Sequence, residues 1–271
     1  MELIGYVAPE RPCRVNAYSV EQPQDPFLRW ERLYLNSQLL PIRHIEACFG
    51  GQYVPQYVQP ALSGAYNRCL EWPEGLPGSV LPLVNILSTG LVLPTMGSAL
   101  DLALAIDWYK IVDESIASTE WSNSEAGEMV HRAKYYVNSP DLRTHARGML
   151  IRKLVAMVVQ HPALAAARYI VSVPGSKGDG HSTGELLAAG VAAATGKQFV
   201  ATIGPERPAR KGDQTYQLRG LFSVPVMMSA PCVIVDDVVR SGSTLREVGL
   251  LAKQAGATQV YGLAAAKTLR S

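Results

Sequence analysis

The stretch CVIVDDVVRSGSTL, residues 232–245, decides which fold we expect for this chain. A short apolar run with strand character leads into two adjacent aspartates, Asp236 and Asp237, and a loop of small hydroxyl and glycine residues follows them. Carboxylates at the end of a buried strand are costly unless something compensates their charge. We therefore expect Asp236 and Asp237 to belong to a ligand site.

The loop after the aspartates runs into a helix predicted at residues 245–255. Free backbone N–H groups and the dipole at a helix start favour an anion. A ligand that suits both sides of this turn carries hydroxyls, or a metal ion, close to a phosphate. A ribose 5-phosphate has this layout, because its ring hydroxyls can donate to the carboxylates while its phosphate occupies the loop.

Around this stretch, the second part of the chain alternates between helix and strand patterns. Apolar spacing predicts helices at 125–137, at 142–160, after Ser182 and at 245–255. Short apolar runs predict strands at 169–174, 198–203, 232–235 and 259–266. Strand–helix–strand repeats of this length predict an α/β protein, with a parallel twisted sheet and helices on both faces. Ligands of such sheets bind outside the carboxyl ends of the strands.

Two of these helices begin with the pattern of a capping box, in which a hydroxyl and a Glu bond each other's backbone N–H. The pairs are Ser182 with Glu185 and Thr244 with Glu247. A glycine beyond each helix, Gly196 or Gly256, predicts its end.

The first 120 residues have a different character. They are rich in proline, and their short, broken apolar runs predict strands and loops with little regular helix. Residues 99–112 are the exception, because their apolar side chains can lie along one side of a helix. We expect a strand- and loop-rich N-terminal subdomain at 1–120, serving as a hood, an acceptor-binding part or an interface, and an α/β domain at 121–271.

Composition narrows the class of protein without naming a function. The chain of 271 residues has a formal net charge of +2 and no polybasic or acidic block, so charge gives no support to nucleic-acid or membrane binding. Its four cysteines form no C-x-x-C pair, so we expect reduced thiols and a cytoplasmic location. The weakly charged region 78–106 is interrupted by proline, asparagine and glycine, so we expect no membrane span.

Residues 232–245 resemble the signature of type I phosphoribosyltransferases: four mostly apolar residues, two acids, two apolar residues and a small hydroxyl–Gly–x–Thr loop. The resemblance implies the fold of that family and a site for phosphoribosyl pyrophosphate. It implies that Asp236 and Asp237 are the catalytic acids, that they hold the ribose hydroxyls, and that they hold Mg²⁺ indirectly, through ribose or water. It places the 5-phosphate in the loop of Arg240, Ser241, Gly242, Ser243 and Thr244.

Two further segments are similar to parts of the same family. The corresponding turn of the family binds pyrophosphate through backbone N–H groups, and here it comprises Val173, Pro174, Gly175, Ser176 and Lys177. The polar loop 204–220 lies where the family has a flexible hood that closes over the substrate. Its candidates for neutralising the departing pyrophosphate are Arg207, Arg210, Lys211 and Gln214. A solvated turn or loop without a ligand is the alternative for each segment.

Arg240 departs from one branch of the family. Purine salvage enzymes that act on hypoxanthine or guanine place an acid at this position, and arginine cannot take a proton from a base at neutral pH. That branch is therefore disfavoured. Arg240 either adds positive charge beside the phosphate or points to solvent.

The order of segments over 121–271 is similar to that of ComF-type competence proteins. It places HRAKYYVNSPDLRTHARGMLI (131–151) before the strand at 169–174 and the signature. The N-terminal zinc ribbon of those proteins has no counterpart here, and their R-G-x-N-Q turn is replaced by GDGHSTGE (178–185).

The resemblance implies a phosphoribosyltransferase that moves the 5-phosphoribosyl group from its pyrophosphate to a nitrogen acceptor, a base, with Mg²⁺ as cofactor. The alternative is a non-catalytic regulatory protein, or a ComF-like DNA-processing protein, that binds phosphoribosyl pyrophosphate or a nucleotide. A homodimer is left open, and the residues do not name the acceptor.

Overall fold

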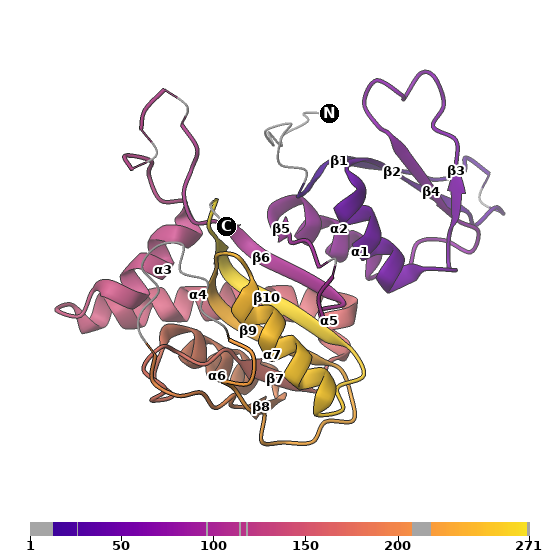
Figure 1. Ribbon diagram of the computed structural model, residues 1–271. Coiled ribbons are helices and arrows are strands. Elements are labelled where there is room, and N and C mark those ends of the chain that lie inside the picture. Colours follow the sequence, from indigo (N-terminus) through magenta and orange to yellow (C-terminus); the bar gives the residue numbers. More distant parts are fainter. Residues whose placement is uncertain are drawn as a thin grey trace. The chain divides into compact units, whose positions relative to one another are not determined.

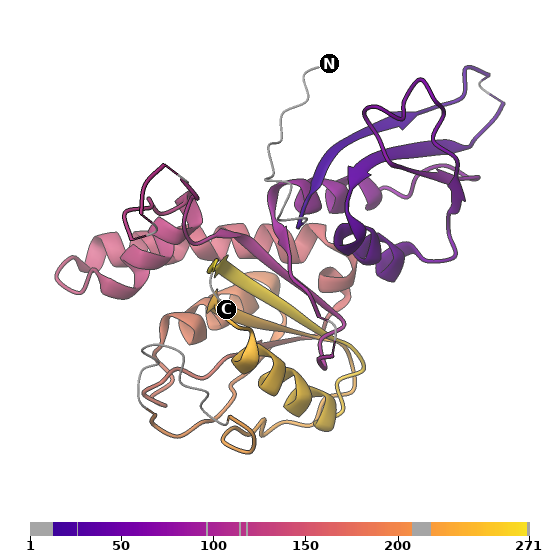
Figure 2. The ribbon, with the colours of Figure 1, turned by 45° about the horizontal axis from the view of Figure 1, so that its top comes forward.

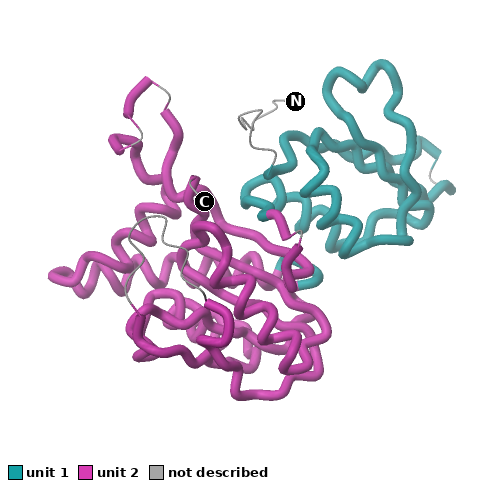
Figure 3. The backbone as a smooth tube through the Cα atoms, viewed as in Figure 1, with its two compact units in different colours: residues 1–93, 160–163 teal, residues 94–159, 164–271 magenta. Residues whose placement is uncertain are grey.

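The computed structural model describes residues 13–25, 27–95, 97–113, 115–117, 119–207 and 218–269. The chain forms two compact units, Met1–Leu93 with Gln160–Ala163, and Pro94–Val159 with Leu164–Ser271 (Figure 3). The first boundary falls earlier than the expected division near residue 120. It does so because residues 102–108 form a strand of the second unit's sheet.

The first unit contains an antiparallel sheet and two helices. Its sheet has the order β1-β2-β4-β3, built from β1 (Val15–Glu21), β2 (Glu31–Ser37), β3 (Val54–Gln56) and β4 (Arg68–Trp72). The helices are α1 (Leu39–Phe49) and α2 (Val80–Thr89), and the short strand β5 (Leu91–Val92) follows. The strands agree with expectation, but "little regular helix" was wrong for α2. Its buried Val80, Leu83, Val84 and Leu87 repeat at helical spacing, and Pro82 falls in the first turn, where a missing N–H costs nothing.

A pair of buried histidines lies in the first unit. The rings of His44 and His161 meet edge to face, with centroids 5.9 Å apart, and both residues are buried. Burial, followed by the neighbouring His161, lowers the pKa of His44 to about 3. Burial lowers the pKa of His161 to about 4. Both rings are therefore neutral in the folded protein at neutral pH.

We expect the first unit to lose stability in mild acid. Unfolded histidines take up protons near pH 6.5, whereas the folded ones stay neutral until about pH 4 or below. The unfolded state therefore binds more protons as the pH falls through this window. Each histidine then costs about 1.4 kcal/mol of unfolding free energy per pH unit.

Urea unfolding at pH 7, 6 and 5, followed through tryptophan fluorescence, measures this slope. His44→Leu should make the slope shallower, while His145→Leu, which replaces an exposed histidine, should leave it unchanged. Equal slopes in all three proteins would contradict the assignment to this pair.

The second unit is built on a parallel sheet. Its strands are β6 (Leu102–Trp108), β7 (Tyr169–Ser172), β8 (Gln198–Val200), β9 (Cys232–Val239) and β10 (Val260–Lys267). They run in the order β6-β10-β9-β7-β8, and each neighbouring pair is parallel. The predicted α/β class is confirmed.

Strand β6 replaces the helix that was predicted at 99–112, so that prediction was wrong. Leu102, Ala103, Leu104 and Ala105 are all buried. A strand covered on both faces shows a continuous apolar run without alternation. Such a run also fits a buried helix, so spacing alone did not distinguish the two.

Five helices accompany this sheet in the described chain. They are α3 (Glu125–Tyr135), α4 (Pro140–Gln160), α5 (Pro162–Ala166), α6 (Thr183–Thr195) and α7 (Ser243–Gln254). Helix α7 lies on one face of β9 and β10, and α4 passes across the other face (Figures 1 and 2). The helices predicted at 125–137, at 142–160 and after Ser182 are confirmed. None of the described helices is both long and apolar enough to span a bilayer.

The start of α6 has the expected capping box. The Ser182 hydroxyl accepts from the Glu185 N–H at 3.3 Å, and the Glu185 carboxylate accepts from the Ser182 N–H at 2.9 Å. Gly196 ends the helix with a φ of 67°, a conformation that glycine adopts without strain. This fixes where α6 begins relative to the turn that precedes it.

Candidate functional site

The two aspartates lie where β9 extends beyond its neighbour β7. The β7–β9 pairing ends with Ser172 opposite Val235, whereas β9 continues to Val239 alongside β10. Asp236 and Asp237 therefore lie within β9, which is four residues longer than predicted, and just past the carboxyl end of β7. The Val173 N–H donates to the Val235 carbonyl at 3.3 Å, so the turn after β7 begins beside the acid pair.

Lys134 of α3 compensates one of the two charges. Its Nζ lies 2.8 Å from Asp237 Oδ2, and Asp237 is only 8% exposed. Burial acts to lower the pKa of Lys134, but the attraction of Asp237 and then of Asp236 outweighs it and leaves this pKa raised. Sequence reasoning assigned no role to Lys134, although it lies in the segment 131–151 that was compared with ComF-type proteins.

Asp236 is the less compensated acid. Burial and the neighbouring Asp237 raise the pKa of Asp236 to about 7, although Lys134 opposes the shift. One carboxylate oxygen accepts from the Asp237 N–H at 2.8 Å. A Cβ on Gly184 would lie 3.2 Å from this oxygen, so the glycine allows the first turn of α6 to approach closely. Hydrogen-bond donors on a ligand would stabilise the ionised form of such a carboxylate.

The loop after β9 encloses a small cavity of about 110 Å³. Its lining includes Asp236 and the whole predicted 5-phosphate loop, Arg240, Ser241, Gly242, Ser243 and Thr244. The Ser241 and Ser243 hydroxyls lie 3.0 Å apart, and Gly242 has a φ of 78°, which favours glycine. The structure therefore brings one acid and the hydroxyl loop to the same cavity.

The second predicted capping box was wrong. Helix α7 begins at Ser243 with Gly242 as its N-cap, and the Ser241 hydroxyl accepts from the Ser243 N–H at 3.4 Å. The Glu247 carboxylate instead accepts from the Gly220 N–H at 3.3 Å. The start of α7 lines the 110 Å³ cavity through Gly242, Ser243 and Thr244, and the dipole at a helix start favours an anion.

The turn after β7 is packed against the start of α6. Its residues Val173 and Pro174 are buried, while Ser176 and Lys177 are exposed. A Cβ on Gly175 would lie 2.5 Å from the Ser182 Cβ, so only glycine fits there. The Gly178 N–H donates to the Gly175 carbonyl at 3.3 Å and closes the turn. The peptide bonds of the described residues are all trans.

Arg207 fastens the beginning of the hood to this turn. Its backbone N–H donates to the Ser176 carbonyl at 2.8 Å, and its guanidinium donates to the Pro174 carbonyl. The guanidinium also lies 4.5 Å from the centre of the Phe222 ring. Arg207 therefore supports the turn in this structure. The other predicted hood residues, Arg210, Lys211 and Gln214, lie outside the described residues.

The residues on either side of the predicted hood, 204–220, are paired with each other. Ile203 and Ser223 exchange two backbone hydrogen bonds, each 2.9 Å long. This pairing lies near the residues that follow β7. A Cβ on Gly178 would lie only 2.7 Å from the Gly204 carbonyl oxygen.

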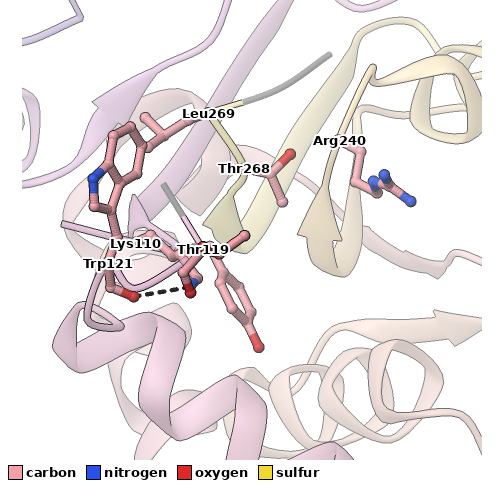
Figure 4. Close-up of a pocket in the computed structure, with 7 residues that line it drawn as sticks. Lys110, Thr119, Trp121, Arg240, Thr268 and Leu269 are labelled. Atoms are coloured by element: carbon pink, nitrogen blue, oxygen red, sulfur yellow. Dashed lines mark hydrogen bonds between the residues drawn. The ribbon is translucent and has the colours of Figure 1, made fainter. Parts of the chain in front are cut away.

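A larger cavity of about 270 Å³ lies at the carboxyl ends of β6, β9 and β10 (Figure 4). It is lined by Tyr109, Lys110, Thr119, Trp121, Arg240, Thr268 and Leu269. Figure 4 shows the Arg240 guanidinium directed away from Trp121 and Lys110. Sequence reasoning missed this cavity because its walls come from separate segments of the chain. The only local signal was an aromatic residue near the end of a strand.

The acid pair suits a magnesium ion that is shared with a substrate. Mg²⁺ prefers carboxylate, phosphate and water oxygens and is commonly held by one or two protein carboxylates. In the described part of the chain no three His, Cys, Asp or Glu side chains are grouped to hold a metal. An ion held by Asp236 and Asp237 would therefore need further ligands from outside this group of side chains.

These elements define a class of protein: a parallel α/β domain with an acid pair and a cavity lined by a hydroxyl–glycine loop at the carboxyl ends of its strands. Such a site can hold a ligand that carries both phosphate and hydroxyl groups. The class follows from the chemistry of the donors and from where the sheet places them.

Comparison with known proteins gives similar folds and no sequence relative. No family model and no curated protein matches the chain. Orotate phosphoribosyltransferase from Aeropyrum pernix is 19% identical with a TM-score of 0.32, over 58% of this chain and 71% of that one. Adenine phosphoribosyltransferase from Leishmania tarentolae is 13% identical with a TM-score of 0.37, over 62% and 77%.

A third solved structure is purine phosphoribosyltransferase from Pyrococcus horikoshii Ot3. It is 14% identical with a TM-score of 0.29, over 45% of this chain and 87% of that one. At these identities and TM-scores, the residues of the site, and not the likeness, carry the functional assignment.

Proposed function

We propose that this chain binds phosphoribosyl pyrophosphate and transfers its 5-phosphoribosyl group to a nitrogen acceptor. One observation carries the proposal. Three segments that are far apart in the sequence, the turn 173–177, the acids Asp236 and Asp237, and the loop 240–244, meet at the carboxyl ends of β7 and β9. Each segment offers the chemistry that one part of this substrate requires.

The phosphate and ribose ends of the substrate have separate partners. The loop 240–244 binds the 5-phosphate with its hydroxyls and with the start of α7, which lines the same cavity. Asp236 and Asp237 accept hydrogen bonds from the ribose hydroxyls, and Lys134 holds Asp237 in place. The turn 173–177, with exposed Ser176 and Lys177, binds the pyrophosphate.

The transfer makes one bond and breaks one. The acceptor nitrogen attacks carbon 1 of the ribose, and the bond from that carbon to the pyrophosphate oxygen breaks. The electron pair leaves with pyrophosphate, and the proton of the acceptor N–H passes to solvent. Positive charge grows on the ribose ring during this step, and the fixed carboxylates of Asp236 and Asp237 stabilise it. When bound, Mg²⁺ neutralises the negative charge of the leaving pyrophosphate.

A second candidate is a non-catalytic protein that binds phosphoribosyl pyrophosphate or a nucleotide and acts in regulation or DNA processing. Arg240 favours it, because the position beside the phosphate loop holds no proton acceptor. Among the described residues that line the two cavities, Asp236 is the only acid. The ligand site is the same for both candidates, so binding alone does not separate them.

Two measurements separate the candidates. Calorimetry with phosphoribosyl pyrophosphate and Mg²⁺ should show saturable binding, and absence of binding would overturn both. Pyrophosphate release should then appear with at least one base from a panel of purines, pyrimidines and pyridines. Binding without release across the whole panel would favour the non-catalytic candidate.

A further inference from the structure

The 270 Å³ cavity lies at the edge of the sheet where the proposed reaction takes place. Tyr109 and Lys110 follow β6, Thr268 and Leu269 follow β10, and Arg240 follows β9. The carboxyl ends of parallel strands are where α/β proteins bind ligands. A volume of about 270 Å³ is just below the usual range of roughly 300–1,000 Å³ for small-molecule pockets, so it suits one heterocycle better than a whole nucleotide.

Trp121 forms a fixed aromatic wall of this cavity. Its indole N–H donates to the Asp113 carbonyl at 2.6 Å, and its own carbonyl accepts from Lys110 Nζ at 2.8 Å. One hydrogen bond therefore holds the indole ring and the other holds the backbone of the same residue. A ligand that stacks on such a ring does not have to order it first, and this favours binding.

The segment that carries Trp121 is itself closed at its base. It forms the long loop between β6 and α3 (Figure 1). The Ile111 N–H donates to the Ser122 carbonyl at 2.9 Å, and the Ser124 N–H donates to the Tyr109 carbonyl at 3.1 Å. Trp121 is thus attached to the end of β6 by backbone hydrogen bonds.

The cavity adjoins the proposed ribose site. Arg240 lines both the 270 Å³ cavity and the 110 Å³ cavity. Tyr109 interacts electrostatically with Lys134 and Asp237, the ion pair beside the ribose position. A ring in the larger cavity therefore has the ribose site next to it.

The basic group beside Trp121 is Lys110, whereas the Arg240 guanidinium is directed away from both residues (Figure 4). Lys110 and Arg240 are among its lining residues, and no acid is among those in the described part of the chain. Lys110 Nζ donates to two carbonyls, those of Trp121 and Thr119. A positive charge at this place strengthens the binding of a ligand with an anionic group and weakens the binding of a cationic ring.

We propose that this cavity binds the acceptor, a planar aromatic nitrogen heterocycle that carries an anionic group such as a carboxylate, and that Trp121 stacks on its ring. The inference rests on the proposed phosphoribosyl transfer and adds the class of acceptor. It makes Trp121 a specificity-determining residue. The 5-phosphate loop and the acid pair keep the roles given above.

The test uses matched pairs of probes and a matched variant. Orotate and uracil, like nicotinate and nicotinamide, differ chiefly in a carboxylate on the ring. With the full chain and phosphoribosyl pyrophosphate present, calorimetry should show tighter binding of the anionic member of at least one pair. Trp121→Ala should weaken that binding by on the order of tenfold or more, the range measured for base–aromatic stacking. Trp121→Phe should retain most of it.

The controls keep this inference separate from the proposed function. Affinity for phosphoribosyl pyrophosphate should be equal in wild type, Trp121→Ala and Trp121→Phe. If phosphoribosyl pyrophosphate does not bind wild type, the proposed function fails. If it binds but no anionic ring does, or if the rings bind Trp121→Ala as tightly as wild type, the inference about the cavity is overturned and the proposed function is untouched.

Discussion

Replacing both acids, Asp236→Asn with Asp237→Asn, is expected to weaken binding of phosphoribosyl pyrophosphate by about 100-fold or more. Each hydrogen bond to a charged group contributes about 1.5–3 kcal/mol, and the two amides lose both charges at the ribose. Calorimetry in Mg²⁺ at fixed salt measures the change. Asp141→Asn, which removes an exposed acid from the first turn of α4, should bind as wild type does. Unchanged affinity in the double variant would show that these acids do not hold the ribose.

The two single variants should separate in stability. Asp237→Asn removes the carboxylate that Lys134 contacts at 2.8 Å, and a partly buried lysine without its partner is costly. Asp236→Asn removes a carboxylate whose pKa burial and Asp237 raise to about 7, so its ionised form opposes folding. Thermal unfolding at pH 8 should therefore show a lower Tm for Asp237→Asn and an equal or higher Tm for Asp236→Asn. The reverse order would contradict this division of roles.

Gly127→Ala is expected to be among the most destabilising single substitutions in the second unit. A Cβ on Gly127 would lie 1.8 Å from the Tyr109 carbonyl oxygen, and a backbone atom cannot rotate away as a side chain can. Helix α3 must therefore move from the end of β6, and overpacking of this kind costs about 1–3 kcal/mol or more. Urea unfolding measures the loss. The same shift displaces Lys134, so binding of phosphoribosyl pyrophosphate should weaken as well.

Gly148→Ala provides a matched control within the same unit. Gly148 also lies inside a helix, and the nearest atom to its added Cβ is the Arg152 side chain at 4.0 Å. Alanine is favoured over glycine in a helix interior by about 1 kcal/mol, so this variant should be more stable than wild type. If both variants change stability by the same amount, the close approach of α3 to Tyr109 does not constrain the fold.

The residues of β9 and the loop after it could be predicted because their signal is local. Apolar strand residues, two acids and a hydroxyl–glycine loop are contiguous in 232–245, and the structure places Asp236 and the loop around one cavity. Helices α3, α4 and α6 could be predicted for the same reason, since the apolar spacing of each lies within its own segment. Helix α6 also has its Ser182–Glu185 cap at its own start.

What could not be predicted depends on contacts between distant segments. The ion pair of Lys134 with Asp237 joins α3 to β9, and no local pattern in either segment predicts this contact. The cavity at Trp121 needs the ends of three strands. Strand β6 has no alternation because both its faces are covered. The cap of Thr244 failed because Gly242 turns the chain so that α7 begins at Ser243, two residues earlier than predicted.

The closed base of the segment from Ile111 to Trp121 has a consequence for the diversity of such proteins. The backbone bonds of Ile111 to Ser122 and of Ser124 to Tyr109 hold its entry and exit together, so we expect its length and sequence to be able to change without disturbing the sheet. Under the proposed function, exchanging this segment alone would give the same scaffold a new acceptor. The proposed phosphate and ribose contacts would stay as they are. The choice of acceptor would then evolve independently of the residues that carry out the transfer.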